Sequence, residues 1–190
     1  MTNVTDPVPH RRSERSAHYN SARGNQVKKR IYLSLGSNIG DRAKNLRSGI
    51  EQLGDLGTVV SVSSIYETEP VEVTGQQPWF LNCAVAIESE LMPRQFLSRA
   101  LWVERALGRR RSGTRSPRTL DVDILLFGDS VIQTAELTVP HPGLAHRRFV
   151  LEPLAEIAPE VRHPLLDLSV RQMLEQLPSN AGAVRRWKEE

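Results

Sequence analysis

The order of strand-like and helix-like segments predicts an α+β fold, a ferredoxin-like (split βαβ) antiparallel sheet with helices packed on it. Two observations lead to this prediction. Apolar and β-branched runs alternate with amphipathic segments in the order β-α-β-β-α-β, which is the order of a split βαβ core. The two amphipathic segments each end at a glycine, a common helix stop. The 190 residues suffice for a single domain with a full hydrophobic core.

Four strands are predicted from runs of apolar and β-branched residues. The first run, IYLSLGS, is almost wholly apolar, and the second, TVVSVSSIYET, is β-branched with a period of two. In order, the predicted strands comprise residues 31–37, 58–68, 79–89 and 120–127. Residues 70–78 contain two prolines and a glycine, and they are predicted to form a loop.

Two helices are predicted from apolar residues at spacings of three and four, one in residues 41–54 and one in 93–107. Their apolar faces are Leu46, Ile50 and Leu53 in the first, and Phe96, Ala100, Val103 and Leu107 in the second. We expect both helices to cover one face of the sheet and to leave the other face free for a cleft. Two further helices are expected at 147–156 and 169–177.

Basic residues are concentrated near the N-terminus. The chain has a net charge of +3 and a pI of about 9.3, but residues 1–30 hold seven of its Lys and Arg against two acidic residues. Residues 31–190 hold 18 basic and 20 acidic residues. We therefore expect a disordered basic extension at 1–30, one domain at 31–180 and a C-terminal tail at 181–190. A weak contact of the extension with nucleic acid or membrane is the alternative.

The cysteine count and the hydropathy pattern indicate a cytoplasmic protein. Cys83 is the only cysteine, so no intrachain disulfide can form. No apolar run approaches the ~20 residues that span a bilayer. The N-terminus lacks the apolar segment of a secretory signal. We expect no membrane partner.

Two aspartates interrupt the predicted strand 120–127. Residues i and i+2 of a strand point to one face, so Asp121 and Asp123 share a face, whereas Leu120, Val122, Ile124 and Leu126 are expected on the other. Two carboxylates this close repel each other, and a divalent cation such as Mg²⁺ relieves the repulsion. Pairing with arginines, or exposure on an edge strand, would explain the same pattern.

Six arginines precede this strand within fourteen residues. They are Arg105, Arg109, Arg110, Arg111, Arg115 and Arg118. Arginine is the preferred bidentate ligand of phosphate, and proline, glycine and serine in the same stretch indicate a loop. An arginine loop beside a carboxylate pair is typical of a polyphosphate site that uses Mg²⁺. Salt bridges between these arginines and the two aspartates are the alternative.

Other candidate segments are weaker on their own. GSNIGDR (36–42) lacks the remaining residues of a dinucleotide or P-loop motif, so it is read as a tight turn with a helix cap. His141 lies between two prolines, and a lone histidine is more often structural. YETEP (66–70), with Phe80 and Asn82 on one strand face, could hold a flat polar heterocycle by stacking and amide pairing.

Together these segments resemble the 6-hydroxymethyl-7,8-dihydropterin pyrophosphokinase family. The motifs that carry the resemblance occur in family order over about residues 31–160. They are LGSNIGDR, SSIYETEP, FLNCAV, ERALGRRR, SPRTLDVDILLFG and LTVPHPGLAHRRFVLEPLAEIAP. PRTLDVDIL together with VPHPGLAHRRFVL is the most specific part.

The resemblance implies a reaction and its cofactors. Family members transfer the β,γ-diphosphoryl group of ATP to the hydroxymethyl oxygen of 6-hydroxymethyl-7,8-dihydropterin, giving AMP, in folate biosynthesis. They use two Mg²⁺ ions, held by the aspartate pair, with ATP as co-substrate. The expected partners are these small molecules, without specific nucleic acid, and the expected state is a monomer. A basic nucleic-acid-binding protein and a catalytically inactive pterin- or nucleotide-binding relative are the alternatives.

The resemblance also assigns residues to roles. The expected catalytic residues are Arg109, Arg118, Asp121 and Asp123, of which the two aspartates bind the metal ions. The expected ATP-binding residues are Glu104, Arg109, Arg111, Arg118, Thr138, His141 and Arg147. The expected pterin-binding residues are Asn38, Thr68, Glu69, Pro70, Val71, Phe80, Asn82 and Phe149.

Overall fold

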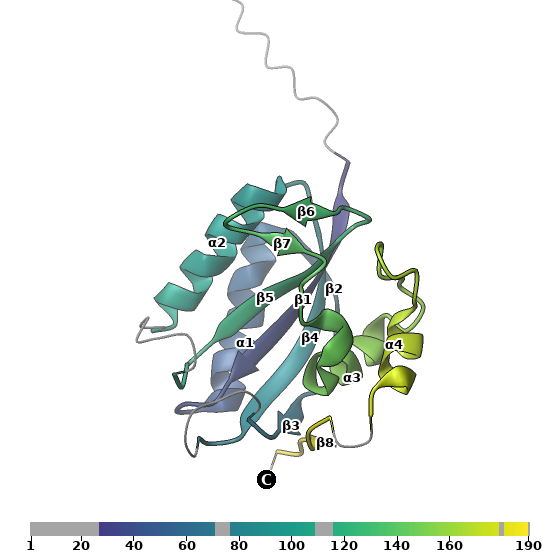
Figure 1. Cartoon of the computed structure of the whole chain (residues 1–190). Coiled ribbons are helices and arrows are strands. Elements are labelled where there is room, and N and C mark those ends of the chain that lie inside the picture. The colour runs from purple at the N-terminus through teal and green to yellow at the C-terminus, as the bar shows by residue number, and fades with distance from the viewer. Residues whose placement is uncertain (1–26, 71–76, 109–115, 179–180, 190) are drawn as a thin grey trace, which may run out of the picture.

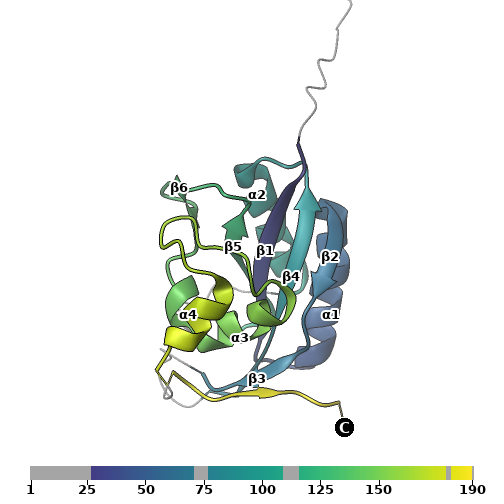
Figure 2. The same ribbon diagram turned by 90° about the vertical axis from the view of Figure 1, so that its right-hand side faces the viewer.

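The computed structural model describes residues 27–70, 77–108, 116–178 and 181–189. A central antiparallel sheet lies between two pairs of helices (Figures 1 and 2). Its strands are β1 (Lys29–Ser37), β2 (Thr58–Val62), β3 (Tyr66–Thr68), β4 (Phe80–Ser89), β5 (Asp121–Phe127) and β8 (Val184–Arg186). The helices are α1 (Arg42–Leu53), α2 (Pro93–Ala106), α3 (Arg148–Ile157) and α4 (Val170–Gln176). The predicted α+β, ferredoxin-like fold in a single domain is confirmed.

The strand order is β5-β1-β4-β3-β8, and β2 pairs with β4 beside this path. All of these pairings are antiparallel. A separate two-stranded ribbon, β6 (Ile132–Gln133) and β7 (Thr138–Val139), lies beside β5. Two short 3₁₀ helices, η1 (Gly54–Leu56) and η2 (Leu144–His146), complete the described elements.

Alternate side chains of the central strands build the first core. Ile31, Leu33 and Leu35 of β1 are buried against α1 and α2, together with the apolar face predicted for each helix. The Asp41 side chain accepts a hydrogen bond of 3.0 Å from the Lys44 amide and so caps α1. This core fixes the sheet against both helices, which leaves the other set of alternate side chains facing away from them.

That other face is not free, contrary to the prediction. Helices α3 and α4 pack on it and form a second core (Figure 2). Ala84 and Ala86 of β4 are small, so the backbone of α3 comes close and its Leu151 and Leu154 become fully buried. No helix within the described ranges has the length and apolarity that crossing a membrane requires.

The predicted single strand 58–68 is two strands separated by a bend. Ser63 causes the interruption, because its hydroxyl accepts a hydrogen bond of 2.9 Å from the Ala84 amide in place of a strand carbonyl. Its own amide donates to the Ala84 carbonyl at 2.9 Å. Both strands therefore remain paired with β4 on either side of the bend.

Both ends of the predicted domain differ from expectation. β1 begins at Lys29, two residues before the predicted start, so the last residues of the expected 1–30 extension belong to the sheet; residues 1–26 lie outside the described ranges. The expected C-terminal tail contributes a strand, because β8 pairs with β3 from Tyr66↔Arg186 to Thr68↔Val184. The domain therefore extends beyond residue 180.

Candidate active site

Asp121 and Asp123 are the first and third residues of β5, and they lie opposite Gly36 and Ser34 of β1. Val122, between them, is buried in the core beneath α1 and α2. The two carboxylates therefore share the opposite face of the sheet, as predicted. Both side chains are only partly exposed.

A β-bulge in β5 sets the neighbourhood of this pair. Ile124 faces Leu33 and Leu126 faces Tyr32, so Leu125 is an extra residue in the ladder. Leu126 therefore lies on the same side as Leu125, in the core beneath α3, and the prediction that it shares the face of Ile124 is wrong. The Leu125 carbonyl accepts a hydrogen bond of 2.9 Å from the His141 amide, which holds His141 close to Asp123.

Charges surround Asp123. Burial raises the pKa of the Asp123 carboxyl and the Asp121 carboxylate raises it further, whereas His141, Arg147 and Arg118 lower it. Burial also lowers the pKa of His141, with Asp123 acting in the opposite direction. Two carboxylates, one imidazole and two guanidinium groups thus lie within electrostatic reach of one another.

His141 and Arg147 come from one turn. The Gly143 amide donates a hydrogen bond of 3.0 Å to His141 Nδ1, so the imidazole proton resides on Nε2. The Arg147 side chain crosses Gly143, where an added Cβ would lie 2.7 Å from Arg147 Nε. Glycine at position 143 therefore allows the guanidinium to take this path toward the carboxylate pair.

Arg118 connects the segment before β5 to the aspartate pair. Its guanidinium lies 2.5 Å from Asp121 Oδ2. Its amide donates to Asn38 Oδ1 at 2.8 Å, and its carbonyl accepts from the Asn38 amide at 3.1 Å. Asn38 is buried, so this double contact anchors Arg118 to the end of β1.

Glu104 and Thr138, two other predicted ATP-binding residues, differ in their surroundings. Glu104 is buried on α2, and its Oε1 accepts a hydrogen bond of 2.8 Å from the Val122 amide. Thr138 is exposed on β7, three residues before His141. The structure therefore brings Glu104 to the backbone of the aspartate strand and leaves Thr138 on the ribbon beside it.

Three of the predicted pterin-binding residues, Thr68, Phe80 and Asn82, lie on the face of the sheet that carries α3. Asn82 Nδ2 donates a hydrogen bond of 2.6 Å to Thr68 Oγ1, and both residues are buried. Phe80 pairs with Thr68 across β3 and β4. Phe149 lies in the first turn of α3, with the Arg147 guanidinium carbon 5.8 Å from the centre of its ring.

Glu69 and Pro70, two further predicted pterin-binding residues, follow β3 and are the last described residues before the gap at 71–76. The Glu69 amide donates to the Ala183 carbonyl at 3.1 Å. Val71, Arg109 and Arg111 lie outside the described ranges, as does Arg115 of the arginine-rich segment.

Gly36 is a site residue that the sequence interpretation missed. An added Cβ on Gly36 would lie 2.7 Å from Asn82 Oδ1 and 3.7 Å from the Phe80 ring. The missing side chain therefore makes room for both. A glycine inside an otherwise buried strand is a signal of close approach and could have pointed to this position.

An open cavity of about 550 Å³ lies on the opposite face of β3. Arg42, Glu67, Trp79 and Arg185 line it, together with Asn38, the residue that follows β1. Glu67 forms ion pairs with Arg42 at 3.0 Å and with Arg185 at 2.6 Å. Within the described ranges, no group of three or more His, Cys, Asp or Glu side chains is arranged to hold a metal ion.

Fold and site together define a class of protein. It is an α+β, ferredoxin-like domain that presents a carboxylate pair beside arginine and imidazole groups, an arrangement suited to a polyphosphate. Residues 32–159 match the model of the 7,8-dihydro-6-hydroxymethylpterin-pyrophosphokinase (HPPK) family. The chain belongs to this family.

Relatives of known name support the assignment. The chain is 43% identical over 160 residues to the 2-amino-4-hydroxy-6-hydroxymethyldihydropteridine pyrophosphokinase of Bacillus subtilis, covering 83% of this chain and 90% of that one. It is 45% identical over 134 residues to the protein of the same name from Methylorubrum extorquens, covering 70% and 84%. It is also 38% identical over 150 residues to Folic acid synthesis protein fol1 of Schizosaccharomyces pombe, covering 78% of this chain but 20% of that protein.

Solved structures agree on the fold. A crystal structure of Plasmodium falciparum HPPK-DHPS with SDX-DHP superposes with a TM-score of 0.65 at 16% identity, over 78% of this chain and 44% of that one. The structure of the same protein with pteroate gives a TM-score of 0.64 at 15% identity, over 78% and 44%. The chain thus spans less than half of these longer proteins.

Proposed function

We propose that this chain transfers the β,γ-diphosphoryl group of ATP to 6-hydroxymethyl-7,8-dihydropterin in folate biosynthesis. The hydroxymethyl oxygen forms a bond to the β-phosphorus of ATP. The bond from that phosphorus to the oxygen bridging it to the α-phosphorus breaks, AMP leaves, and a proton is released to solvent. Membership of the family supports this reaction class, and so do relatives named for the pyrophosphokinase that match most of the chain.

The observation that carries the proposal is the gathering of charge around Asp121 and Asp123. Arg118, from the segment before β5, and His141 and Arg147, from one turn after β7, all act on the charge of Asp123. Guanidinium groups fixed in this way can bind phosphate oxygens and stabilise charge that develops on them during transfer. Arg109 and Arg111, outside the described ranges, are proposed as further phosphate ligands, and Glu104 and Thr138 as residues of the nucleotide side.

The carboxylate pair fits a divalent cation. Asp121 and Asp123 offer hard oxygen ligands on one face, and burial together with repulsion by Asp121 raises the pKa of Asp123. We expect two Mg²⁺ ions to be held by these residues together with ATP oxygens and water. Bound Mg²⁺ supplies charge neutralisation of the phosphates. Arg118, paired with Asp121, would keep that carboxylate oriented in the absence of substrate.

The acceptor pocket is proposed at Thr68, Phe80, Asn82 and Phe149. Asn38, Glu69 and Pro70 are proposed as further pterin-binding residues, as is Val71, which lies outside the described ranges. Thr68 and Asn82 offer a buried hydroxyl and a buried amide that already bond each other, so their remaining donors and acceptors have fixed directions for a pterin edge. Phe80 and Phe149 supply aromatic faces for stacking.

A product analysis tests the reaction. The purified chain is incubated with ATP, Mg²⁺ and 6-hydroxymethyl-7,8-dihydropterin, and the nucleotides are separated. We expect AMP and pterin diphosphate in equal amounts, with no AMP when the pterin is omitted. Formation of ADP instead would indicate transfer of a single phosphoryl group and would contradict the proposal, as would absence of turnover. The nucleic-acid-binding alternative predicts salt-dependent DNA or RNA binding, and family membership does not favour it.

A further inference from the structure

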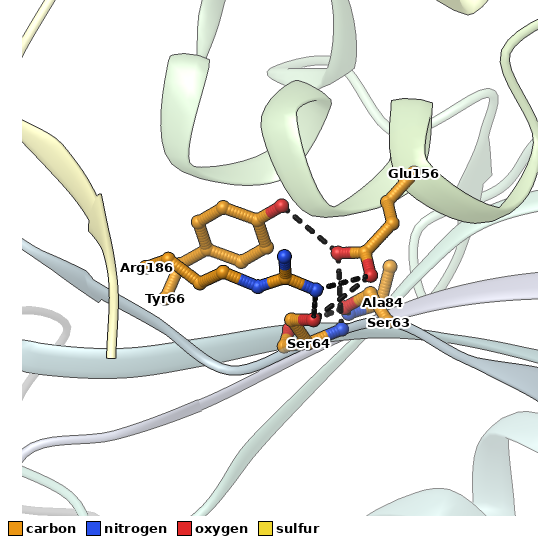
Figure 3. Close-up of polar contacts among 6 residues, drawn as sticks. All are labelled: Ser63, Ser64, Tyr66, Ala84, Glu156 and Arg186. Atoms are coloured by element: carbon orange, nitrogen blue, oxygen red, sulfur yellow. Dashed lines mark hydrogen bonds and ion pairs between the residues drawn. The ribbon is translucent and has the colours of Figure 1, made fainter. Parts of the chain in front are cut away.

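A polar cluster joins α3, the bend between β2 and β3, and the C-terminal strand β8 (Figure 3). The Glu156 carboxylate, in the last turn of α3, accepts hydrogen bonds from the Ser64 amide at 3.0 Å, the Ser64 hydroxyl at 2.8 Å and the Tyr66 hydroxyl at 2.9 Å. Arg186 of β8 lies 3.2 Å from the same carboxylate and also donates to the Ser64 hydroxyl.

These contacts hold Glu156 as a carboxylate. Burial alone would raise the pKa of Glu156, but the Ser64 and Tyr66 donors and Arg186 bring it below its usual value. Burial and the neighbouring carboxylate raise the pKa of Tyr66 to about 12, so its hydroxyl keeps its proton and remains a donor. The cluster is therefore complete at neutral pH.

The cluster lies directly beside the proposed acceptor pocket. Tyr66 pairs with Asn82 on one side and with Arg186 on the other, so the three side chains form a row on the face that carries α3. The next row on that face contains Phe80, Thr68 and Val184. Fixing Tyr66 therefore fixes β3 where Thr68 receives the Asn82 amide.

Helix α3 connects the cluster to the other side of the pocket. Glu156 lies about two helical turns from Phe149, roughly 10 Å along the axis. The contacts of Glu156 at the end of α3 therefore help to fix how far the helix is shifted along its axis and how it is rotated. Both determine where Phe149, in its first turn, lies relative to the sheet.

β8 also contacts β3 through a side chain on the opposite face of the sheet. Arg185 bonds Glu67 at 2.6 Å and lies over the Trp79 ring at 5.0 Å. Arg185 and Arg186 are consecutive, so their side chains project to the two faces of the sheet. Neither is needed to fill a core, since both side chains are mostly exposed.

We propose that the C-terminal strand positions the acceptor pocket, with Arg186 and Glu156 as positioning residues that lock α3 and β3 together around it. The inference rests on the proposed function, because the pocket is the pterin pocket of that proposal. Both residues act through Tyr66, Thr68 and Phe149 rather than on substrate. An exposed ion pair adds little to stability, so its loss should alter pocket geometry more than folding.

Arg186→Met and Glu156→Gln test the inference, each keeping about the native side-chain length. The matched control is Arg171→Met, which removes another exposed ion pair, Arg171 with Glu160 at 2.9 Å. Calorimetric dissociation constants are measured for the pterin and, separately, for ATP with Mg²⁺. We expect about a tenfold weaker pterin affinity in both variants, with ATP affinity and melting temperature close to those of the control. Arg186→Lys should restore part of the pterin affinity.

The two proposals fail in different ways. Lack of pterin binding by the unmodified chain overturns the proposed function. Normal binding by the unmodified chain, together with variants that match Arg171→Met or lose pterin and ATP affinity equally, overturns the positioning role alone. The Arg186→Met, Glu156→Gln double variant should lose little more than either single variant, because the ion pair between Arg186 and Glu156 is already lost in each single variant. If Glu156→Gln does not fold, Arg186→Met decides, because it leaves Glu156 with its Ser64 and Tyr66 donors.

Discussion

Glu104 of α2 accepts a hydrogen bond of 2.8 Å from the backbone amide of Val122, the residue between Asp121 and Asp123. β5 is the terminal strand of the sheet, paired with β1 on one edge. The Glu104 side chain of α2 thus accepts the hydrogen bond of the Val122 amide on the other edge of β5. This contact joins the aspartate strand to α2. The burial of Glu104 means that this contact is shielded from water.

Glu104→Ala should destabilise the protein by about 1–3 kcal/mol, since a buried amide loses its acceptor. Glu104→Gln keeps an acceptor oxygen and should cost less. Urea unfolding followed by circular dichroism measures both. Glu51→Ala, an exposed change on α1, should lie within about 0.5 kcal/mol of the native chain. Equal stability of Glu104→Ala and Glu51→Ala would show that the contact is dispensable.

Gly36→Ala should weaken binding of the pterin. The new methyl group would lie 2.7 Å from Asn82 Oδ1, so the Asn82 amide would have to leave its position beside Thr68. We expect about a tenfold loss of pterin affinity with ATP affinity retained. Fluorescence or calorimetric titration measures each. Gly54→Ala, where an added Cβ meets nothing within 4 Å, is the control, and identical pterin affinities in the two variants would count against the pocket.

Gly143→Ala should separate activity from stability. The backbone at Gly143 has φ −88° and ψ 0°, which alanine can adopt, but its Cβ would lie 2.8 Å from Arg147 Cζ. The flexible Arg147 side chain can move aside, so the unfolding midpoint should stay nearly constant. Turnover should fall by about tenfold or more, because the guanidinium leaves the carboxylate pair. A variant with full turnover would mean that this path of Arg147 is not used.

His163 should make stability depend on pH. Its Nδ1 accepts hydrogen bonds of 3.2 Å from the Leu165 and Leu166 amides, and burial lowers its pKa. The unfolded chain, with an ordinary histidine pKa of about 6.5, therefore binds protons more readily. The contribution of His163 to the free energy of unfolding is complete above about pH 6.5. It is lost as the pH falls through the lowered pKa of His163 in the folded state.

An NMR titration of the imidazole signals measures this pKa directly. Urea midpoints at acid and neutral pH compare the native chain with His163→Gln, whose amide oxygen can accept the same hydrogen bonds. The native chain should lose more stability on acidification than the variant. A His163 pKa at or above 6.5 would disprove the assignment.

The shared face of Asp121 and Asp123 could be predicted because it follows from the period of a strand alone. The position of Leu126 could not, because the bulge at Leu125 depends on the register with β1 and on the His141 amide that uses the freed carbonyl. Alternation is a local property, whereas a bulge is decided by two segments far apart in the chain.

β8 and the packing of α3 and α4 were likewise invisible to local patterns. Val184–Arg186 is short and basic, and it becomes a strand only because β3 offers an open edge. The two helices were expected near their observed positions, but their amphipathic spacing does not say which surface they cover. Small side chains at Ala84 and Ala86 provide that surface.

Replacement of Asp121 or Asp123 by asparagine tests most directly whether the carboxylate pair drives diphosphoryl transfer. Each change keeps the size of the side chain and removes its charge. Asp129→Asn, an exposed change just beyond β5, is the control. Release of AMP from ATP in the presence of Mg²⁺ and 6-hydroxymethyl-7,8-dihydropterin should fall more than about a hundredfold in both site variants, with circular dichroism spectra and the Asp129→Asn rate unchanged. Near-native AMP release by either folded site variant would contradict the role of the pair.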